Sequence, residues 1–359
     1  MNKKIIALAI AETLGMAPPL QADEGQVTLY GQANLAVEIS SQGGGGSNLG
    51  QRTNIASNGS RLGVKGWEGL AGGLKAVFLI EASADGMDSG AAPGAGGSFF
   101  GAREGYAGLS SAEYGTVALG FFGQPYKTAT AALDVFGGII ADYASIMANV
   151  HGANLYDTSI TNSIIYFAPK SHGVGGQLQY GFGENEGNNR DRWGAQINYS
   201  NGPWYFTYAH AAQNNFNVAN SRSADKFAGS YAFNGATTLI ALYESLRSDE
   251  DTATTPRTSD RDAWYLGLTH KLGNSTLRFA YAKAQDSDGS LADDGARYFA
   301  LGISHTFSKR TEIYGLYTRM DNAADGTYGL GQTGSTNIVL PGIPGRDPHS
   351  FALGVLHKF

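Results

Sequence analysis

The sequence predicts an all-β fold in the form of a closed transmembrane antiparallel β-barrel, and three observations lead to it. Residues 26–40 alternate apolar side chains with polar or small ones, and so do the last nine residues, which end on Phe359. Because successive side chains of a strand point to opposite faces, this alternation suits one face in lipid and one in water. The chain has no run of about 20 apolar residues, the length that a membrane helix requires. Alternating strands at both ends of the chain favour a sheet that closes on itself.

The composition supports this fold class and argues against others. The chain has 359 residues, 51 glycines and no cysteine, which fits neither an ordinary enzyme nor a disulfide-rich secreted domain. Its mean hydropathy is −0.21, because apolar and polar residues are interleaved. The formal net charge of −6 argues against nucleic acid as a partner, since nucleic-acid-binding proteins carry a basic surplus or a basic stripe.

Residues 1–22 have the features of a secretory signal peptide. Two lysines precede a mostly apolar segment over 5–17, and Leu20-Gln21-Ala22 forms a candidate cleavage site. Cleavage after Ala22 would leave residues 23–359 as the mature barrel domain. A cytosolic amphipathic helix is the alternative interpretation of this segment.

Segments with a period of two, separated by turn residues, predict sixteen strands in one meander without a helical domain or a linker. The predicted strands span 26–40, 58–70, 74–85, 100–111, 115–123, 161–169, 174–184, 190–200, 203–213, 224–233, 236–247, 262–272, 275–286, 296–307, 310–321 and 348–359. Tight turns such as Asn201-Gly202 alternate with long polar stretches such as 41–57, 248–261 and 322–347. This asymmetry is typical of outer-membrane barrels, whereas a soluble sandwich would lack it.

Sixteen is a strand count at which a barrel keeps an aqueous channel, whereas eight strands are filled by side chains. The strand over 296–307 supports water inside, because Phe299, Leu301 and Ile303 alternate with small or polar residues. Aromatic residues near strand ends are candidates for the girdles at the two membrane interfaces. These candidates are Trp204, Phe206, Phe233, Trp264, Phe307 and Phe359.

Five short motifs mark the mature chain. They are Val27-Thr28-Leu29-Tyr30-Gly31, Ser60-Arg61-Leu62-Gly63-Val64-Lys65-Gly66, Ala102-Arg103-Glu104 followed by Gly108-Leu109, Tyr114-Gly115-Thr116-Val117, and the terminal Lys358-Phe359. Together they resemble the general porins of Gram-negative outer membranes, most closely the beta-proteobacterial type. The resemblance covers essentially the whole mature chain and implies a sixteen-stranded homotrimeric diffusion channel whose third outer loop folds into the lumen. It also implies that Phe359 is an assembly signal read by the barrel-assembly machinery.

The chain departs from this family at the end of the fifth predicted strand. The family commonly has Gly-Arg there, whereas this sequence has Gly120-Phe121-Phe122. One positive charge expected near the pore is therefore missing.

The longest insertion between predicted strands, residues 123–160, is the expected constriction loop. Loops beyond about 15 residues are usually functional or disordered, and this one is too apolar for disorder. Residues 128–133 offer a short helix. A surface loop with solvated carboxylates is the alternative. The candidate pore residues of the expected constriction loop are the acids Asp134, Asp142 and Asp157 and the aromatic residues Tyr126 and Tyr143.

The opposite charges are expected on the barrel wall. If Leu62 and Val64 face lipid, Arg61 and Lys65 point inward, because a cation facing lipid at mid-membrane would cost about 2–4 kcal/mol. The same alternation turns Lys75 and Glu81 inward on the next strand, and Arg103 joins them. The sequence thus predicts a basic wall of Arg61, Lys65, Lys75 and Arg103 that faces an acidic side of Asp134, Asp142 and Glu81. For each cation a plain solvated position in the lumen is the alternative.

This arrangement predicts a passive channel for ions and small hydrophilic solutes with a weak anion preference, because charges at the constriction act at closer range than acids at the mouth. A substrate-specific outer-membrane channel and an adhesive surface barrel are the alternative functions. The expected partners are further copies of the chain, outer-membrane lipid and lipopolysaccharide.

Other motifs add no catalytic chemistry. Gly329-Leu330-Gly331-Gln332-Thr333-Gly334 fits the dinucleotide pattern G-x-G-x-x-G, but no βαβ unit surrounds it. The seven histidines show no metal-ligand spacing, and no cofactor is expected. Four aspartates crowd one outer loop and form either a solvated acidic loop or a weak divalent-cation site bridging to lipopolysaccharide phosphates. They are Asp286, Asp288, Asp293 and Asp294.

Overall fold

The fold was analysed in a computed structural model. It describes residues 24–43, 50–89, 100–150, 153–154, 156–183, 191–214, 221–248, 251–252, 255–256, 260–288, 293–331 and 343–359. The predicted signal peptide, residues 1–22, lies outside the described residues. So does the second half of the G-x-G-x-x-G match, Gln332-Thr333-Gly334.

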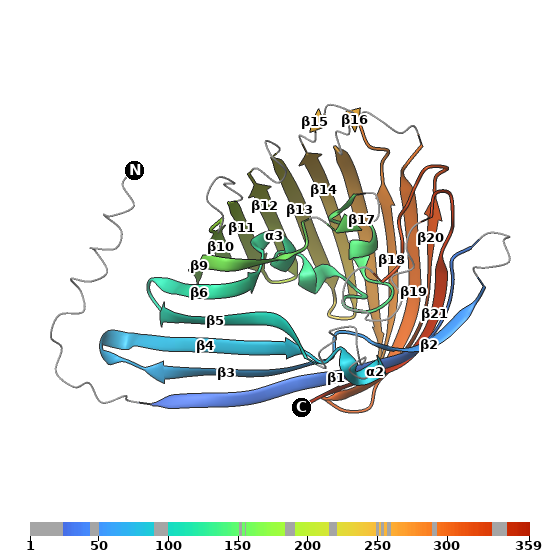
Figure 1. Ribbon diagram of the computed structural model, residues 1–359. Coiled ribbons are helices and arrows are strands. Elements are labelled where there is room, and N and C mark those ends of the chain that lie inside the picture. Colours follow the sequence, from blue (N-terminus) through green and yellow to red (C-terminus); the bar gives the residue numbers. More distant parts are fainter. Residues whose placement is uncertain are drawn as a thin grey trace.

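The described strands form a closed antiparallel barrel (Figure 1). Closure comes from β1 (Gly25–Ser41), which pairs with β21 (His349–Lys358) at the other end of the chain. β2 (Arg52–Ser57) and β3 (Arg61–Gly69) pair with successive halves of β1, so together they occupy one strand position with a break at residues 58–60. The seventeen segments of the sheet therefore make a sixteen-stranded barrel, as predicted.

The remaining barrel strands pair in sequence order, each antiparallel to the one before. They are β4 (Leu74–Ser83), β5 (Gly101–Ser111), β6 (Gly115–Gly123), β9 (Ser159–Ser171), β10 (Val174–Gly181), β11 (Arg192–Asn201), β12 (Trp204–Gln213), β13 (Arg222–Phe233), β14 (Thr237–Ser248), β17 (Arg261–Leu272), β18 (Ser275–Ala284), β19 (Ala296–Thr306) and β20 (Thr311–Asn322). Two small hairpins lie in loops, β7 (Asn149–Val150) with β8 (Ala153–Asn154) and β15 (Asp251–Thr252) with β16 (Thr255–Pro256).

The structure corrects two local predictions. Residues 52–57 were expected in the loop over 41–57 but form β2, because β1 continues to Ser41 and offers them a pairing edge. The expected helix over 128–133 is split into α3 (Pro125–Thr128) and the 3-10 turn η3 (Ala131–Leu133). Residue 130, between them, has a non-helical backbone, with φ −124° and ψ 0°.

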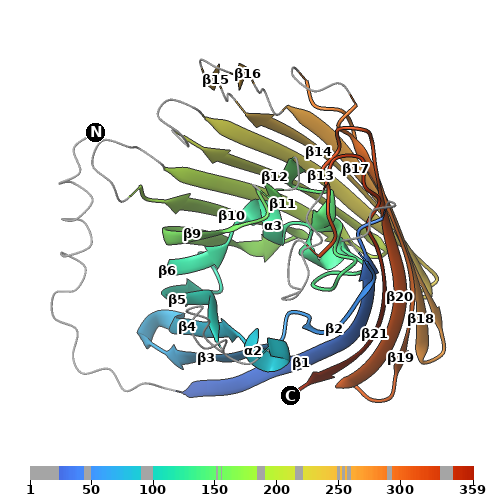
Figure 2. The same cartoon turned by 45° about the vertical axis from the view of Figure 1, so that its right-hand side comes forward.

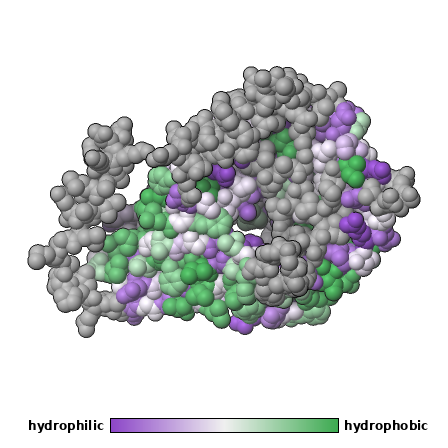
Figure 3. Space-filling model, in the orientation of Figure 1, coloured by the Kyte–Doolittle hydropathy of each residue, from purple (hydrophilic) through white to green (hydrophobic). Residues whose placement is uncertain are grey.

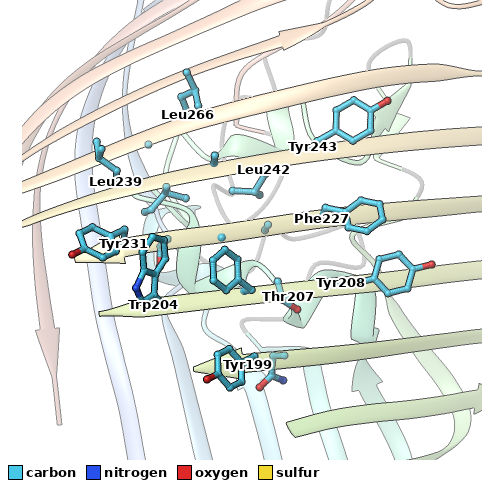
Figure 4. Close-up of a pocket in the computed structure, with 18 of the residues that line it drawn as sticks. Tyr199, Trp204, Thr207, Tyr208, Phe227, Tyr231, Leu239, Leu242, Tyr243 and Leu266 are labelled. Carbon is cyan, nitrogen blue, oxygen red and sulfur yellow. The ribbon is translucent and has the colours of Figure 1, made fainter. Parts of the chain in front are cut away.

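The outward face of the barrel is apolar, as the alternation predicts. Figure 3 shows hydrophobic residues spread over the region where β1 and β3–β6 lie in Figure 1. On the other side of the barrel, β10–β14, β17 and β18 carry a shallow apolar groove of about 1090 Å³ (Figure 4). Trp204 and Tyr231, which line it, pack with ring centroids 4.3 Å apart, and Trp204 stacks on Phe206 at 5.6 Å. Trp204 and Phe206 are predicted girdle residues and face outward, about half exposed.

No helix in the described part of the chain is long and apolar enough to span a membrane.

Candidate functional site

The loop between β6 and β9 lies inside the barrel (Figure 2). Its apolar side chains, among them Leu133, Phe136 and Ile140, form one buried cluster with inward residues of β14, β17, β18, β19 and β20. This packing removes the loop's apolar surface from water, which explains why so apolar a loop is ordered within an aqueous lumen. The prediction that this loop folds into the lumen is confirmed.

A cavity of about 810 Å³ remains between the loop and the wall of β1, β3, β5, β18, β20 and β21. Charged side chains from both sides line it. The wall contributes Arg61, Arg103, Arg278, Glu312 and Lys358, and the loop contributes Lys127, Asp134, Asp142 and Asp157. The structure thus brings together two of the four predicted wall cations and the predicted loop acids around one aqueous space.

Arg61 and Arg103 share one carboxylate on the wall. Glu81 on β4 lies 3.4 Å from the Nε of Arg61 and 2.9 Å from the Nε of Arg103, and it accepts a hydrogen bond from the Tyr30 hydroxyl at 2.8 Å. Both arginine side chains are about one-third exposed, at 33% and 34%. Glu81 therefore lies within the basic wall, next to Glu104 in the register, and the two arginines rather than these carboxylates line the cavity.

A β-bulge turns Arg103 inward. The register of β4 and β5 shifts between Glu81 and Ala82, which leaves Arg103 as an extra residue opposite β4. Strict alternation from Ala107, which faces outward with Leu109, would have directed Arg103 to lipid. Bulges commonly re-aim a side chain in this way beside functional sites.

Lys65 and Lys75 lie further along the wall. Neither belongs to the residues that line the cavity. The ammonium of Lys65 lies 5.1 Å from the centre of the Tyr30 ring, and that of Lys75 lies 4.3 Å from the centre of the Trp67 ring. They continue the positive wall from Arg61 toward the turn over residues 70–73.

The loop acids Asp134 and Asp142 are engaged with backbone. Asp134 accepts hydrogen bonds from the amides of Phe136 (2.9 Å) and Tyr143 (3.0 Å), while Asp142 accepts from those of Gly138 (2.7 Å) and Ala144 (2.8 Å). Burial, together with the neighbouring charge of Asp142, raises the pKa of Asp134 well above its usual range. Both carboxylates therefore hold the shape of the loop, and they oppose the wall cations less than two fully ionised, solvated acids would.

Comparison with known families gives a match over residues 6–325 to the family described as Gram-negative porin. The chain belongs to this family. It is accordingly a passive diffusion channel of the outer membrane, crossing it as a multi-pass β-barrel, and not an enzyme.

Several individual proteins are similar to this porin along most of their length. Outer membrane porin protein 32 of Delftia acidovorans is 28% identical over 372 residues, covering 100% of both chains. Major outer membrane protein P.IB of Neisseria meningitidis is 29% identical over 324 residues, covering 87% of this chain and 91% of that protein. Among solved structures, the anion-selective porin from Comamonas acidovorans has a TM-score of 0.77 at 26% identity, covering 94% of this chain and all of that one.

The porin's loop is anchored to the wall by buried charges that the sequence analysis did not single out. These are Lys226 on β13, Glu244 on β14 and Arg261 on β17, and each is at most 2% exposed. Glu244 accepts hydrogen bonds from the Tyr126 hydroxyl (2.9 Å), the Ala148 amide (2.7 Å) and Arg261 (2.9 Å). Tyr126 of the loop, predicted as a wall of the pore, is thus fully buried against the barrel wall as part of this anchor.

The second half of the anchor is centred on Lys226. Its ammonium lies 3.2 Å from Asp157 of the loop, 3.9 Å from Glu244 and 4.0 Å from the centre of the Tyr126 ring. Tyr143, which does line the cavity, hydrogen-bonds Thr130 at 2.9 Å. Four buried charges thus pair with one another and hold the loop in place. They belong to Lys226, Glu244, Arg261 and Asp157.

Aromatic packing lies next to the position of the missing wall cation, which the Gly-Arg pattern puts directly after Gly120. Phe122 faces inward, is 3% exposed and stacks on Tyr106 with ring centroids 4.9 Å apart. Phe167 contacts its edge at 6.4 Å. Apolar contact therefore lies in this porin next to the place where the family commonly has a positive charge.

The chain terminus lies at the barrel seam. Phe359 is half-exposed and exchanges two backbone hydrogen bonds with Gly31, both 3.1 Å long. A Cβ at Gly31 would lie 2.5 Å from the Phe359 ring, so only glycine lets this ring lie against β1. Phe359 facing outward places Lys358 inward, where it lines the cavity. The role of Phe359 as an assembly signal stays a prediction.

The four aspartates of the outer loop do not meet as a metal site. The Asp286 carboxylate accepts a hydrogen bond from the Gly295 amide (2.8 Å), and that of Asp293 accepts one from the Ala324 amide (3.3 Å). The Asp294 carboxylate accepts hydrogen bonds from both the amide and the hydroxyl of Ser287. Within the described residues, no group of three or more histidines or acids is placed to hold a metal ion. These bonds assign the carboxylates of Asp286, Asp293 and Asp294 to loop structure.

Proposed function

We propose that this porin admits ions and small hydrophilic solutes through a charged constriction with a weak preference for anions. The observation that carries the proposal is the arginine pair of Arg61 and Arg103, which shares the single carboxylate of Glu81. Both arginines line the cavity, whereas neither Glu81 nor Glu104, the carboxylate opposite it in the register, does so, and positive charge therefore faces the cavity. An ion in the constriction comes closer to the arginine pair than the Debye length, about 8 Å at physiological salt. Salt therefore screens the interaction between the ion and the arginines only weakly.

The other charges around the cavity favour the same sign. Lys127 and Lys358 add positive charge, whereas Arg278 and Glu312 neutralise each other at 2.9 Å. The loop acids are hydrogen-bonded to backbone or, in Asp157, paired with Lys226. A solved structure similar to this chain is described as an anion-selective porin, which agrees with this balance. Phe121 and Phe122 in place of the cation that the resemblance implies after Gly120 are the reason to expect a weak preference.

Planar bilayer recordings of the purified protein test this function. We expect ohmic conductance steps that individual sugars do not block, and a reversal potential in a KCl gradient whose sign corresponds to chloride permeating faster than potassium. Block by one solute would support the substrate-specific channel instead, and clear cation selectivity would refute the proposed constriction.

We further propose that the porin is a homotrimer. Its outward face on β3, β4 and β5 carries small residues, including Gly66, Ala76 and Ala107, which permit close contact between barrels. Denaturing electrophoresis without heating should then show a band well above the 37.7 kDa of one full-length chain, converted to a single-chain band by heating. A single-chain band from an unheated, folded sample would contradict the trimer.

A further inference from the structure

The inner wall at the loop end of β1 holds a buried acid without a basic partner. Glu38 is fully buried, and no ion pair joins it to a lysine, arginine or histidine among the described residues. Its Oε1 accepts a hydrogen bond from the Asn58 amide at 3.2 Å, and its Oε2 has no hydrogen-bond partner. A buried carboxylate is costly unless it is paired or coordinates a metal.

Two asparagine side chains with unpartnered atoms lie next to Glu38. Asn54 on β2 lies directly opposite Glu38 in the register, and neither its Oδ1 nor its Nδ2 has a partner. Asn58 is 1% exposed, and its Oδ1 is likewise unpartnered. Native proteins leave few buried polar atoms unsatisfied, so the unpartnered oxygens of Glu38, Asn54 and Asn58 indicate a missing ligand.

A second carboxylate approaches from the segment after β4. Asp88, on the short helix α2 (Gly86–Ser89), accepts a hydrogen bond at 2.8 Å from the amide of Ser57, the residue before Asn58. Its negative charge acts on Glu38. Two acids held close together in a buried setting repel each other unless a cation lies between them.

We propose that these residues form a calcium site, with the carboxylates of Glu38 and Asp88 and the amide oxygens of Asn54 and Asn58 as ligands. Calcium takes six to eight oxygen ligands from carboxylates, amide carbonyls and water, in a flexible geometry. The absence of histidine and cysteine from the set disfavours zinc. Half of the ligands are amides, so the site differs from the groups of three or more acids or histidines that are absent from the described residues.

Calcium would fasten three parts of the chain at the entrance to the constriction. The segment after β4 is already tied to the break between β2 and β3, through the Ala84 amide to the Ser60 carbonyl at 2.8 Å and the Ser57 hydroxyl to the Ala84 carbonyl at 3.3 Å. Arg61 follows that break directly. The ion would therefore stabilise the wall next to the arginine pair and offset the charge of the two acids.

The test uses the full folded porin in detergent, freed of divalent ions with a chelator and titrated with CaCl₂ or MgCl₂. We expect calorimetry to find one calcium site per chain that the Glu38→Gln variant has lost, and calcium to raise the thermal midpoint of the wild type more than magnesium does. In chelator, Glu38→Gln should unfold at a higher temperature than the wild type, because the repulsion is gone. Glu113→Gln, the same change in an exposed turn, should behave as the wild type.

Asn54→Ala provides a second variant at a partly exposed position, should Glu38→Gln fail to fold. We expect it to fold and to bind calcium at least tenfold more weakly. The proposal is overturned if calcium leaves the wild-type midpoint unchanged, or if both variants bind calcium as the wild type does. It is also overturned if, in the presence of chelator, a mildly acidic pH raises the thermal midpoint of the wild type and calcium raises it no further. Glu38 would then be a protonated acid and not a calcium ligand.

Discussion

Replacing Glu244 by alanine should release the constriction loop and destabilise the folded porin by about 3–5 kcal/mol, the usual cost of removing one partner from a buried ion pair. Glu244 is fully buried and accepts from Tyr126, Ala148 and Arg261 at once. Without it, Lys226 keeps its ion pair with Asp157, whereas the buried Arg261 loses its ion pair with Glu244. The two bonds that join Glu244 to the loop, from Tyr126 and Ala148, are lost in the same step.

Two measurements check this result. Urea unfolding in detergent should give a midpoint well below that of the wild type, and single-channel recordings should show a larger, noisier conductance because the loop no longer holds one position. Glu312→Ala is the matched control. Glu312 also pairs with an arginine, Arg278, but the two side chains are 22% and 24% exposed, so its loss should cost no more than about 1 kcal/mol. Equal effects of the two changes would show that the buried anchor is no stronger than a half-exposed pair.

The barrel itself could be predicted because a period of two is a strong signal when one face lies in lipid. Each of the sixteen predicted strands appears with small changes at its ends, and Arg61 faces inward as the alternation requires. β2 escaped prediction because its polar start, Arg52-Thr53-Asn54, looks like a loop until the pairing edge of β1 is known. Tertiary pairing, which local composition does not carry, decided its conformation.

The site was less predictable because contacts between residues far apart in sequence decide which charges face the cavity and which hold the loop. Alternation places Lys226 and Glu244 inside the barrel, but it does not tell whether their partner is water or a loop about 70 to 120 residues away in sequence. Asp134 and Asp142 were recognised as loop acids, yet their bonds to backbone amides depend on the fold of the loop. Lys358 had a readable signal, because an outward Phe359 requires an inward neighbour.

Replacing both Arg61 and Arg103 by alanine should reverse the ion preference of the channel. Each single change removes one of two cations from Glu81, which stays neutralised by the other. The double change removes both and leaves the Glu81 carboxylate facing the cavity without a cation. We therefore expect a small shift of the reversal potential for each single variant and a shift larger than their sum for the pair, toward cation selectivity.

Two further variants, Lys75→Ala and the double variant with Glu81→Gln added, test whether the arginine pair controls ion selection. Lys75 pairs in register with Gly69, eight residues beyond Arg61 on β3, which places it about 26 Å along the wall at roughly 3.3 Å per residue. That distance is about three Debye lengths at physiological salt, so Lys75→Ala should barely change the reversal potential. Adding Glu81→Gln to the double variant should restore part of the anion preference, because it removes the uncovered charge. If Lys75→Ala shifts the reversal potential as much as Arg61→Ala does, ion selection is spread along the whole wall and the constriction at the arginine pair does not control it.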